Sequence, residues 1–116
     1  QSLQAIDRGV AELVRTLARS SRLANTYIVF TSDNGFHLGQ HRLPAGKRAP
    51  YDEDIRVPFL VRGPGIAKGS HVDAITGNVD IAPTLAAVLG LKLPDGTFDG
   101  RCLDLDGGAG NSCERN

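Results

Sequence analysis

A single apolar stripe marks the first part of the chain. Apolar residues recur there at a spacing of three or four positions, and charged residues fall between them. This spacing places the apolar side chains on one face of an α-helix. The stripe consists of Leu3, Ile6, Val10, Leu13, Val14 and Leu17. The pattern predicts a helix that ends before the polar connection beginning at Ser20.

Two short apolar segments predict strands. Residues 27–31 are β-branched and aromatic without strict alternation, which is typical of a strand buried on both faces in a parallel sheet. A helix that leads into such a strand is half of a βαβ unit. Residues 57–61 form the second segment, where Pro58 indicates a strand that begins there or lies toward a sheet edge. We therefore expect an α/β fold with a mostly parallel sheet flanked by helices.

Glycine, proline and capping residues divide the rest of the chain. Residues 36–50 contain two Gly and two Pro and predict a long loop, of a kind that is often functional. Residues 51–56 predict a short helical turn, and residues 72–75 a short extended segment. A later helix is expected to begin with Asp80 as its N-cap and to end at Gly90 as its C-cap.

Composition narrows the classes of function. The 116 residues amount to one domain or part of a larger one, and their 41% hydrophobic content is enough for a packed core. Thirteen basic and 13 acidic residues cancel, so charge gives no argument for nucleic-acid binding. No run approaches the roughly 20 apolar residues of a membrane span. Cys102 and Cys113 are either a disulfide or two unpaired thiols, and the sequence does not choose between them.

Two oxygen-bearing side chains follow the first predicted strand. Asp33 and Asn34 lie at its carboxyl end, and open α/β sheets bind their ligands at the carboxyl ends of the strands. Carboxylate and amide oxygens suit a hard cation such as Ca²⁺. Asp-Asn-Gly is also common turn chemistry, and from these residues alone an ordinary Asx turn is the favoured interpretation.

Basic side chains in the long loop are the next candidates. Lys47 could hold an anionic group near a metal as a point charge, although an isolated lysine is usually a solvated surface residue. His37 and His41 have the spacing of a helical zinc pair, which Gly39 between them disfavours. Substrate contact or acid–base chemistry is open to both histidines, beside plain surface placement.

An acidic run follows the loop. Asp52, Glu53 and Asp54 could bind a cation, but a solvated helix start is the simpler interpretation, because acidic side chains favour helix N-termini. Arg56 is expected to pair with one of them and to hold the loop.

Taken in order, these segments resemble the sulfatase family, within the alkaline-phosphatase-like superfamily. The resemblance runs from the first predicted helix to about Leu103 and is greatest to sulfatases of N-acetylglucosamine-6-sulfate and related glycan sulfates. No single motif decides it, but the ordered series is specific. The matching segments are residues 26–35, the His37 to His41 stretch with Lys47, and residues 51–58, 62–65, 78–85 and 99–103.

The resemblance implies roles for individual residues. Asp33 and Asn34 would be Ca²⁺ ligands, which reverses the preference for a plain turn. Lys47 would contact the sulfate, and His37 and His41 would line the substrate pocket. The family's nucleophile is a formylglycine made from Cys in a Cys-x-Pro-x-Arg motif, and its hydrated form attacks sulfur. The implied partners are a sulfated small molecule or glycan and the remainder of the catalytic domain.

The chain also departs from the family. It has no Cys-x-Pro-x-Arg, and Cys102 precedes Leu103-Asp104-Leu105, so it cannot serve as the nucleophile. We expect residues 1–105 to be the C-terminal portion of a sulfatase catalytic domain, inactive alone, and residues 106–116 to be a flexible tail. The resemblance suggests a secreted, periplasmic or lysosomal parent protein. Two alternatives are a phosphomonoester or phosphodiester hydrolase of the same superfamily and a non-catalytic binding or structural fragment.

Overall fold

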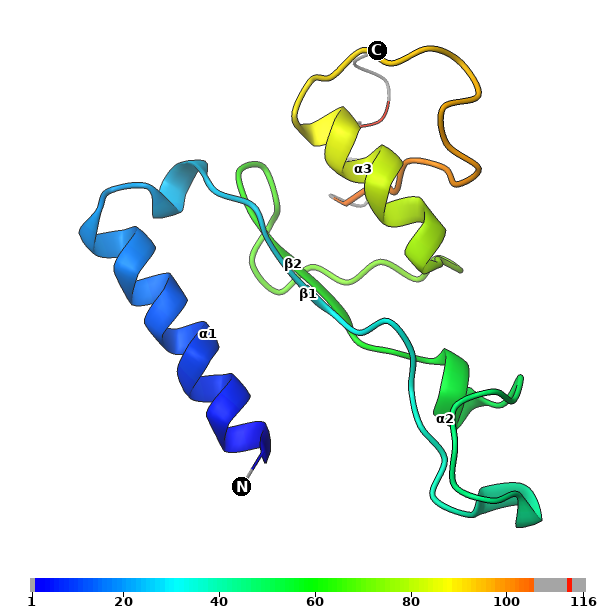
Figure 1. Ribbon diagram of the computed structural model, residues 1–116. Coiled ribbons are helices and arrows are strands. Elements are labelled where there is room, and N and C mark those ends of the chain that lie inside the picture. Colours follow the sequence, from blue (N-terminus) through cyan, green and yellow to red (C-terminus); the bar gives the residue numbers. More distant parts are fainter. Residues whose placement is uncertain (1, 106–112, 114–116) are drawn as a thin grey trace.

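Two antiparallel strands form the centre of the structure. The computed structural model describes residues 2–105 and 113. Strand β1 (Ile28–Thr31) pairs with β2 (Phe59–Arg62), with Ile28 opposite Arg62 and Thr31 opposite Phe59. The expected parallel pairing is therefore not observed between these strands. Residues 32–58 form a long excursion that returns the chain alongside β1 in the opposite direction (Figure 1).

A close approach fixes the ends of the strands away from this excursion. The Tyr27 hydroxyl donates to the Pro64 carbonyl at 2.8 Å. The Tyr27 ring lies so close to Gly63 that a Cβ there would be 2.1 Å from it. Gly63 is thus required at the end of β2, because any side chain would displace the tyrosine.

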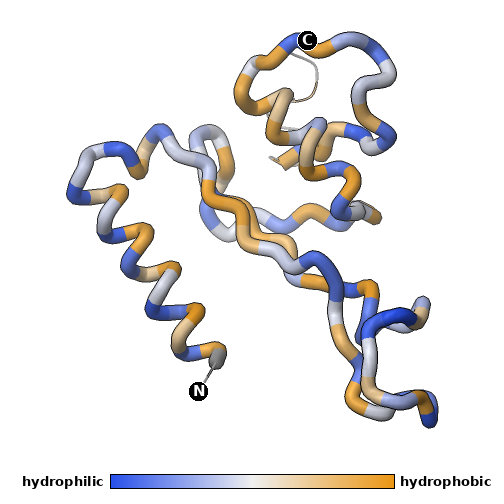
Figure 2. Tube along the Cα trace, in the orientation of Figure 1, coloured by the Kyte–Doolittle hydropathy of each residue, from blue (hydrophilic) through white to orange (hydrophobic). Residues whose placement is uncertain are grey.

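Helix α1 (Ser2–Arg19) confirms the helix predicted from the apolar stripe. Figure 2 shows hydrophobic and hydrophilic positions alternating along its turns. The stripe remains open, since Leu3 is 79% and Leu13 49% exposed. Among the described elements, α1 packs only against the neighbouring 3₁₀ turn η1 (Leu23–Asn25). Bonds within the helix itself therefore hold it, and its apolar stripe has no apolar partner in the described part of the chain.

The excursion between the strands carries the predicted loop. It contains a 3₁₀ turn, η2 (Gln40–Arg42), and an isolated antiparallel bridge between His37 and Gly46. The short helix α2 (Asp52–Ile55) confirms the predicted helical turn. Residues 72–75, predicted as a short extended segment, have exposed side chains and no strand partner among the described residues.

Helix α3 (Ile81–Val88) follows a 3₁₀ turn, η3 (Asn78–Asp80). Asp80 immediately precedes the helix, but its carboxylate does not cap the α3 amides as predicted. Its two oxygens instead accept hydrogen bonds from the backbone amides of Gly77 and Arg101, each at 2.9 Å, since the fold brings these two amides against the carboxylate. The predicted C-cap is confirmed: Gly90 has φ of 67°, and the amide of Leu91 bonds back to Ala86 at 2.9 Å.

Most of the buried side chains among the described residues lie on and around α3. The Thr84 hydroxyl donates to the Asp80 carbonyl at 2.6 Å and accepts from the Leu103 amide at 2.8 Å. Cys102 and Cys113 form a disulfide, which resolves the open alternative. The predicted flexible tail lies outside the described residues except for Cys113.

The chain as a whole is extended. Its radius of gyration is 16.7 Å, against about 13 Å for a compact domain of 100 residues. Among the described residues the buried hydrophobic side chains are Ala86, Ala87 and Leu103, so the substantial core expected from composition is absent. None of the described helices is long and apolar enough to cross a bilayer.

Candidate functional site

A cavity of about 810 Å³ opens where β1 ends and β2 begins. Its walls come from the end of β1, the long loop, α2 and the segment before α3. Asp33, Asn34 and Lys47, three of the residues singled out in the sequence, all line it. The fold thus brings a carboxylate, an amide and an ammonium group to one cavity from positions up to 14 residues apart in the chain.

The Asp33–Asn34 turn leaves oxygen atoms available. Asp33 Oδ1 accepts from the Asn34 amide at 2.9 Å, which is turn chemistry. The Asn34 side-chain nitrogen donates to the Gly35 carbonyl at 2.7 Å and so orients the side-chain amide. Asp33 Oδ2 and Asn34 Oδ1 have no hydrogen-bond partner within residues 2–105 and 113. The same two residues can therefore form the turn and still bind a metal ion through their remaining oxygens.

These two free oxygens fit part of a Ca²⁺ site. Calcium takes six to eight oxygen ligands, of which Asp33 and Asn34 would supply about two. Within the described residues there is no group of three or more His, Cys, Asp and Glu side chains that could hold a metal ion. The donor chemistry fits the cation, and the number of donors corresponds to a partial site.

Two distant contacts hold the turn in place. The Asn78 side-chain nitrogen donates to the carbonyls of Asp33 at 2.8 Å and Ser32 at 3.2 Å. On the other side, the Gly35 amide donates to the Asp54 carbonyl at 2.7 Å. A Cβ on Gly35 would lie 2.0 Å from the Glu53 carbonyl oxygen, so only glycine permits this approach of α2. Asn78 was not among the site residues predicted from the sequence, where its one signal is an amide side chain at the start of a helix.

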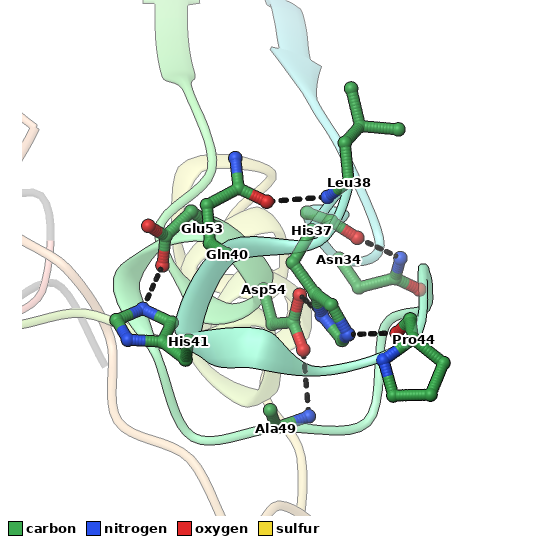
Figure 3. A network of polar contacts seen from close by, with 10 residues as sticks. Asn34, His37, Leu38, Gln40, His41, Pro44, Ala49, Glu53 and Asp54 are labelled. Carbon is green, nitrogen blue, oxygen red and sulfur yellow. Dashed lines mark hydrogen bonds and ion pairs between the residues drawn. The ribbon is translucent and has the colours of Figure 1, made fainter.

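Figure 3 shows a buried histidine–carboxylate pair, His37 and Asp54, of which Asp54 also lines the cavity. His37 Nδ1 is 2.7 Å from Asp54 Oδ1, and the two residues are 4% and 3% exposed. The second ring nitrogen, Nε2, is 2.8 Å from the Pro44 carbonyl oxygen. The other carboxylate oxygen of Asp54 accepts from the Ala49 amide at 2.6 Å. The expected solvated helix start is therefore wrong for Asp54, whose carboxylate is buried by its partners in the loop.

The two groups favour each other's charged forms. The hydrogen bond with Asp54 raises the pKa of His37, against the opposing effect of burial. Burial acts to raise the pKa of Asp54, but hydrogen bonds from His37 and the Ala49 amide outweigh it and lower that pKa. Both ring nitrogens of His37 face oxygen acceptors, and only an imidazolium has two N–H donors. The arrangement is that of an imidazolium–carboxylate pair.

Lys47 lies between two of these attachment points. Gly46 before it exchanges backbone hydrogen bonds with His37, at 2.8 and 3.0 Å. Ala49, two residues after it, is held by the Asp54 carboxylate. The Lys47 ammonium itself has no hydrogen-bond or ion-pair partner among the described residues. The loop thus brings to the cavity wall a lysine whose charge is free to meet an anion.

His41 occupies a separate position on the loop. Its ring stacks on Tyr51, with centroids 3.7 Å apart, and its Nε2 is 3.2 Å from Glu53 Oε2. His41 and Arg42 both adopt left-handed backbone conformations, with φ of 57° and 60°. Neither His41 nor His37 lines the cavity that contains Lys47. Their different partners also place the two rings in different environments, away from the geometry of a zinc pair.

Arg56 adds a second basic group to the cavity wall. Its guanidinium is 3.8 Å from the Asp52 carboxylate, which confirms the predicted pairing with an acidic neighbour. Both side chains are highly exposed, at 83% and 78%, so the pair contributes little to stability.

Comparison with known proteins identifies the family. The sulfatase family model matches residues 1–91. The chain is 47% identical over 109 residues to the sulfatase ppz1 of Metarhizium majus, covering 92% of the chain and 25% of that protein. It is 44% identical over 103 residues to the N-acetylglucosamine-6-sulfatase of Homo sapiens, covering 89% of the chain and 19% of that protein.

A solved structure shares the fold. It is a complex of a protein with its substrate, D-glucosamine-2-N,6-O-disulfate, and superposes with a TM-score of 0.75 at 38% identity. The match covers 90% of this chain and 20% of the solved one, and it supports the α/β class predicted from the sequence. The chain spans about a quarter or less of the length of the relatives named here. With the family model matching well over half of its residues, the chain belongs to the sulfatase family.

Proposed function

We propose that this chain forms one wall of the active site of an enzyme that hydrolyses sulfate esters on glycans. The observation that carries the proposal is that Asp33, Asn34 and Lys47 line one cavity. Two free side-chain oxygens there can bind a cation, and a free ammonium group can bind an anion. A sulfate ester needs both, because its sulfo oxygens carry negative charge and further negative charge develops on the leaving ester oxygen as the S–O bond breaks.

Each residue has a distinct part in this scheme. Asp33 and Asn34 hold Ca²⁺ through their carboxylate and amide oxygens, and Asn78 keeps the backbone of their turn in place. Lys47 binds a sulfo oxygen as a point charge. When bound, the cation supplies electrostatic stabilisation of the negative charge. His41, on the exposed side of the loop, is a proposed contact to the rest of the substrate.

The nucleophile lies outside this chain in the proposal. A formylglycine from a Cys-x-Pro-x-Arg motif requires residues that the 116-residue sequence lacks. We therefore expect no turnover by the chain alone, and activity only when the rest of a sulfatase catalytic domain completes the site. The same remainder would cover the open stripe of α1 and extend the two strands into a larger, alkaline-phosphatase-like sheet.

The names of similar proteins guide the choice of substrate. One relative is an N-acetylglucosamine-6-sulfatase, and the solved neighbour holds a disulfated glucosamine as its substrate. We propose sulfated glucosamine units of glycans as the substrate class for the protein that carries this chain.

The decisive experiment replaces Lys47 by alanine in the full-length protein. Removing one charged group that stabilises a developing anion lowers turnover by about 100- to 1000-fold. Lys68→Ala is the matched control, because Lys68 is exposed and lies outside the walls of this cavity. Hydrolysis of an aryl sulfate and of the corresponding aryl phosphate is measured side by side.

Equal turnover of wild-type and Lys47→Ala protein would refute the sulfate contact. Preferential cleavage of the phosphate would instead support the phosphohydrolase alternative. Lack of turnover of either ester by the full-length wild-type protein would count against catalysis altogether and favour a binding or structural role.

A further inference from the structure

We propose that His37 is a positioning residue: together with Asp54 it braces the loop 36–50 so that Lys47 is presented to the cavity. This role differs from substrate contact or proton transfer, the two chemical roles open to His37 on sequence grounds. The importance of Lys47 rests on the proposed function above, but the brace is a structural feature that can be tested separately.

His37 has no free ring nitrogen. Nδ1 bonds to Asp54 at 2.7 Å and Nε2 to the Pro44 carbonyl at 2.8 Å. The residue is 4% exposed and is absent from the walls of the cavity. To touch a substrate or accept its proton, the ring would have to leave two hydrogen bonds and a buried carboxylate. That cost makes a direct chemical role unfavourable.

The bonds made by His37 and Asp54 attach to the loop on both sides of Lys47. They reach the loop at three points: the His37 backbone bridges to Gly46, the His37 ring reaches Pro44, and the Asp54 carboxylate reaches Ala49. Two of these points precede Lys47 in the sequence and one follows it. A lysine held on both sides has little freedom to move its backbone, whereas its own side chain makes no bond within the described residues.

Asp54 connects the loop that bears Lys47 to the turn that bears Asp33 and Asn34. Its side chain holds the loop that bears Lys47, and its backbone carbonyl accepts from Gly35, the neighbour of Asn34. One buried residue therefore sets the position of the lysine relative to the oxygen-bearing turn. A misplacement of about 1 Å is enough to lower turnover by roughly 100-fold, so such a brace has catalytic consequences.

The chain offers a matched control for the brace. His71 and Asp73 form a second His–Asp pair, at 2.9 Å, but their side chains are 82% and 92% exposed. His71→Ala removes the same type of interaction without touching the loop. If every His–Asp pair mattered equally, His37→Ala and His71→Ala would behave alike.

The structural test is amide hydrogen exchange in the full-length protein. In His37→Ala, exchange at Gly46 and Ala49 is expected to accelerate by about 10- to 100-fold, because the buried carboxylate loses its partner and the loop opens more often. In His71→Ala, exchange at both amides stays at the wild-type rate. Unchanged exchange at Gly46 and Ala49 in His37→Ala would overturn the brace. If His37→Ala fails to fold, His37→Gln retains one N–H donor and is the milder variant.

The functional test is a double-mutant cycle between His37→Ala and Lys47→Ala, read as kcat/KM for an aryl sulfate. A residue that acts through Lys47 has nothing left to position once the ammonium is gone. The double variant is therefore expected to match Lys47→Ala alone, while His37→Ala by itself loses roughly 100-fold. Losses that multiply in the double variant would overturn the proposal and give His37 an independent role. If the wild-type protein hydrolyses no sulfate ester, the proposed function fails, and the exchange measurement still decides the brace.

Discussion

Helix α1 and the loop 36–50 are held in opposite ways. The helix has regular backbone hydrogen bonds throughout, yet its apolar stripe is exposed and its one neighbour among the described elements is η1. The loop has almost no regular structure, yet hydrogen bonds from His37 and Asp54 fix it at several points. Regular secondary structure and firm anchoring are therefore separate properties in this chain. The anchored segment is the one that carries the lysine of the candidate site.

The largest expected effect concerns α1 in the full-length protein. If the remainder of the catalytic domain covers the stripe, as proposed, Leu13→Ala destabilises that protein by about 2–5 kcal/mol, the usual cost of truncating a buried leucine. Arg8→Ala, off the stripe, changes the free energy of unfolding by no more than about 0.5 kcal/mol. Urea unfolding measures both. A loss for Leu13→Ala no greater than for Arg8→Ala would mean that the stripe stays exposed.

A smaller effect is expected where polar bonds hold α3. Thr84 is 2% exposed, and its hydroxyl serves the Asp80 carbonyl and the Leu103 amide at once. Thr84→Val keeps the shape but leaves the buried Leu103 amide without its acceptor, at a cost of about 1–3 kcal/mol. Thr97→Val is the control, since its hydroxyl bond to Pro94 is exposed. Thermal unfolding compares the two, and equal melting temperatures would contradict the importance assigned to the buried hydroxyl.

The smallest expected effect is the pH dependence of the loop. Folding raises the pKa of His37. The stability that the charged His37 contributes to the folded loop is therefore complete below the ordinary pKa of 6.5 and is lost as pH rises through the raised pKa. Folding lowers the pKa of Asp54. The stability that the Asp54 carboxylate contributes is therefore complete above the ordinary pKa of 3.8 and is lost as pH falls through the lowered pKa. The pair is strongest between these two ordinary values.

Amide exchange at Ala49, corrected for the intrinsic rate, measures this dependence, with amides of α1 as the internal reference. Protection at Ala49 relative to α1 is expected to be greatest in that window and to fall on either side of it. A ratio that does not change with pH would mean that the charge of the pair contributes nothing to holding the loop.

Local patterns predicted the local structure well. The apolar period gave α1, the β-branched segments gave β1 and β2, and Gly90 ends α3 as its position indicated. The direction in which β1 and β2 pair could not be predicted, because it depends on the path of the 27 residues between Thr31 and Phe59. The pattern within β1 therefore did not determine the direction of its partner.

The candidate site was predictable only in part, for the same reason. The resemblance to sulfatases singled out Asp33, Asn34 and Lys47, and the fold brings them to one cavity. Asp54 was interpreted as part of a solvated acidic run, because its partner His37 lies 17 residues away and no short-range pattern links them. Asn78 reaches the Asp33 carbonyl across 45 residues. Bonds of this length are set by the tertiary fold and leave no periodic signal in the sequence.

A structure of the full-length protein with Ca²⁺ and a 6-O-sulfated glucosamine tests the central claim most directly. We predict the cation on the carboxylate of Asp33 and the amide oxygen of Asn34, with the Lys47 ammonium in hydrogen-bond contact with a sulfo oxygen and the His37–Asp54 pair intact behind it. A cation bound elsewhere, with the Asp33 and Asn34 side chains in bulk water and Lys47 turned away from the sulfate, would contradict the account.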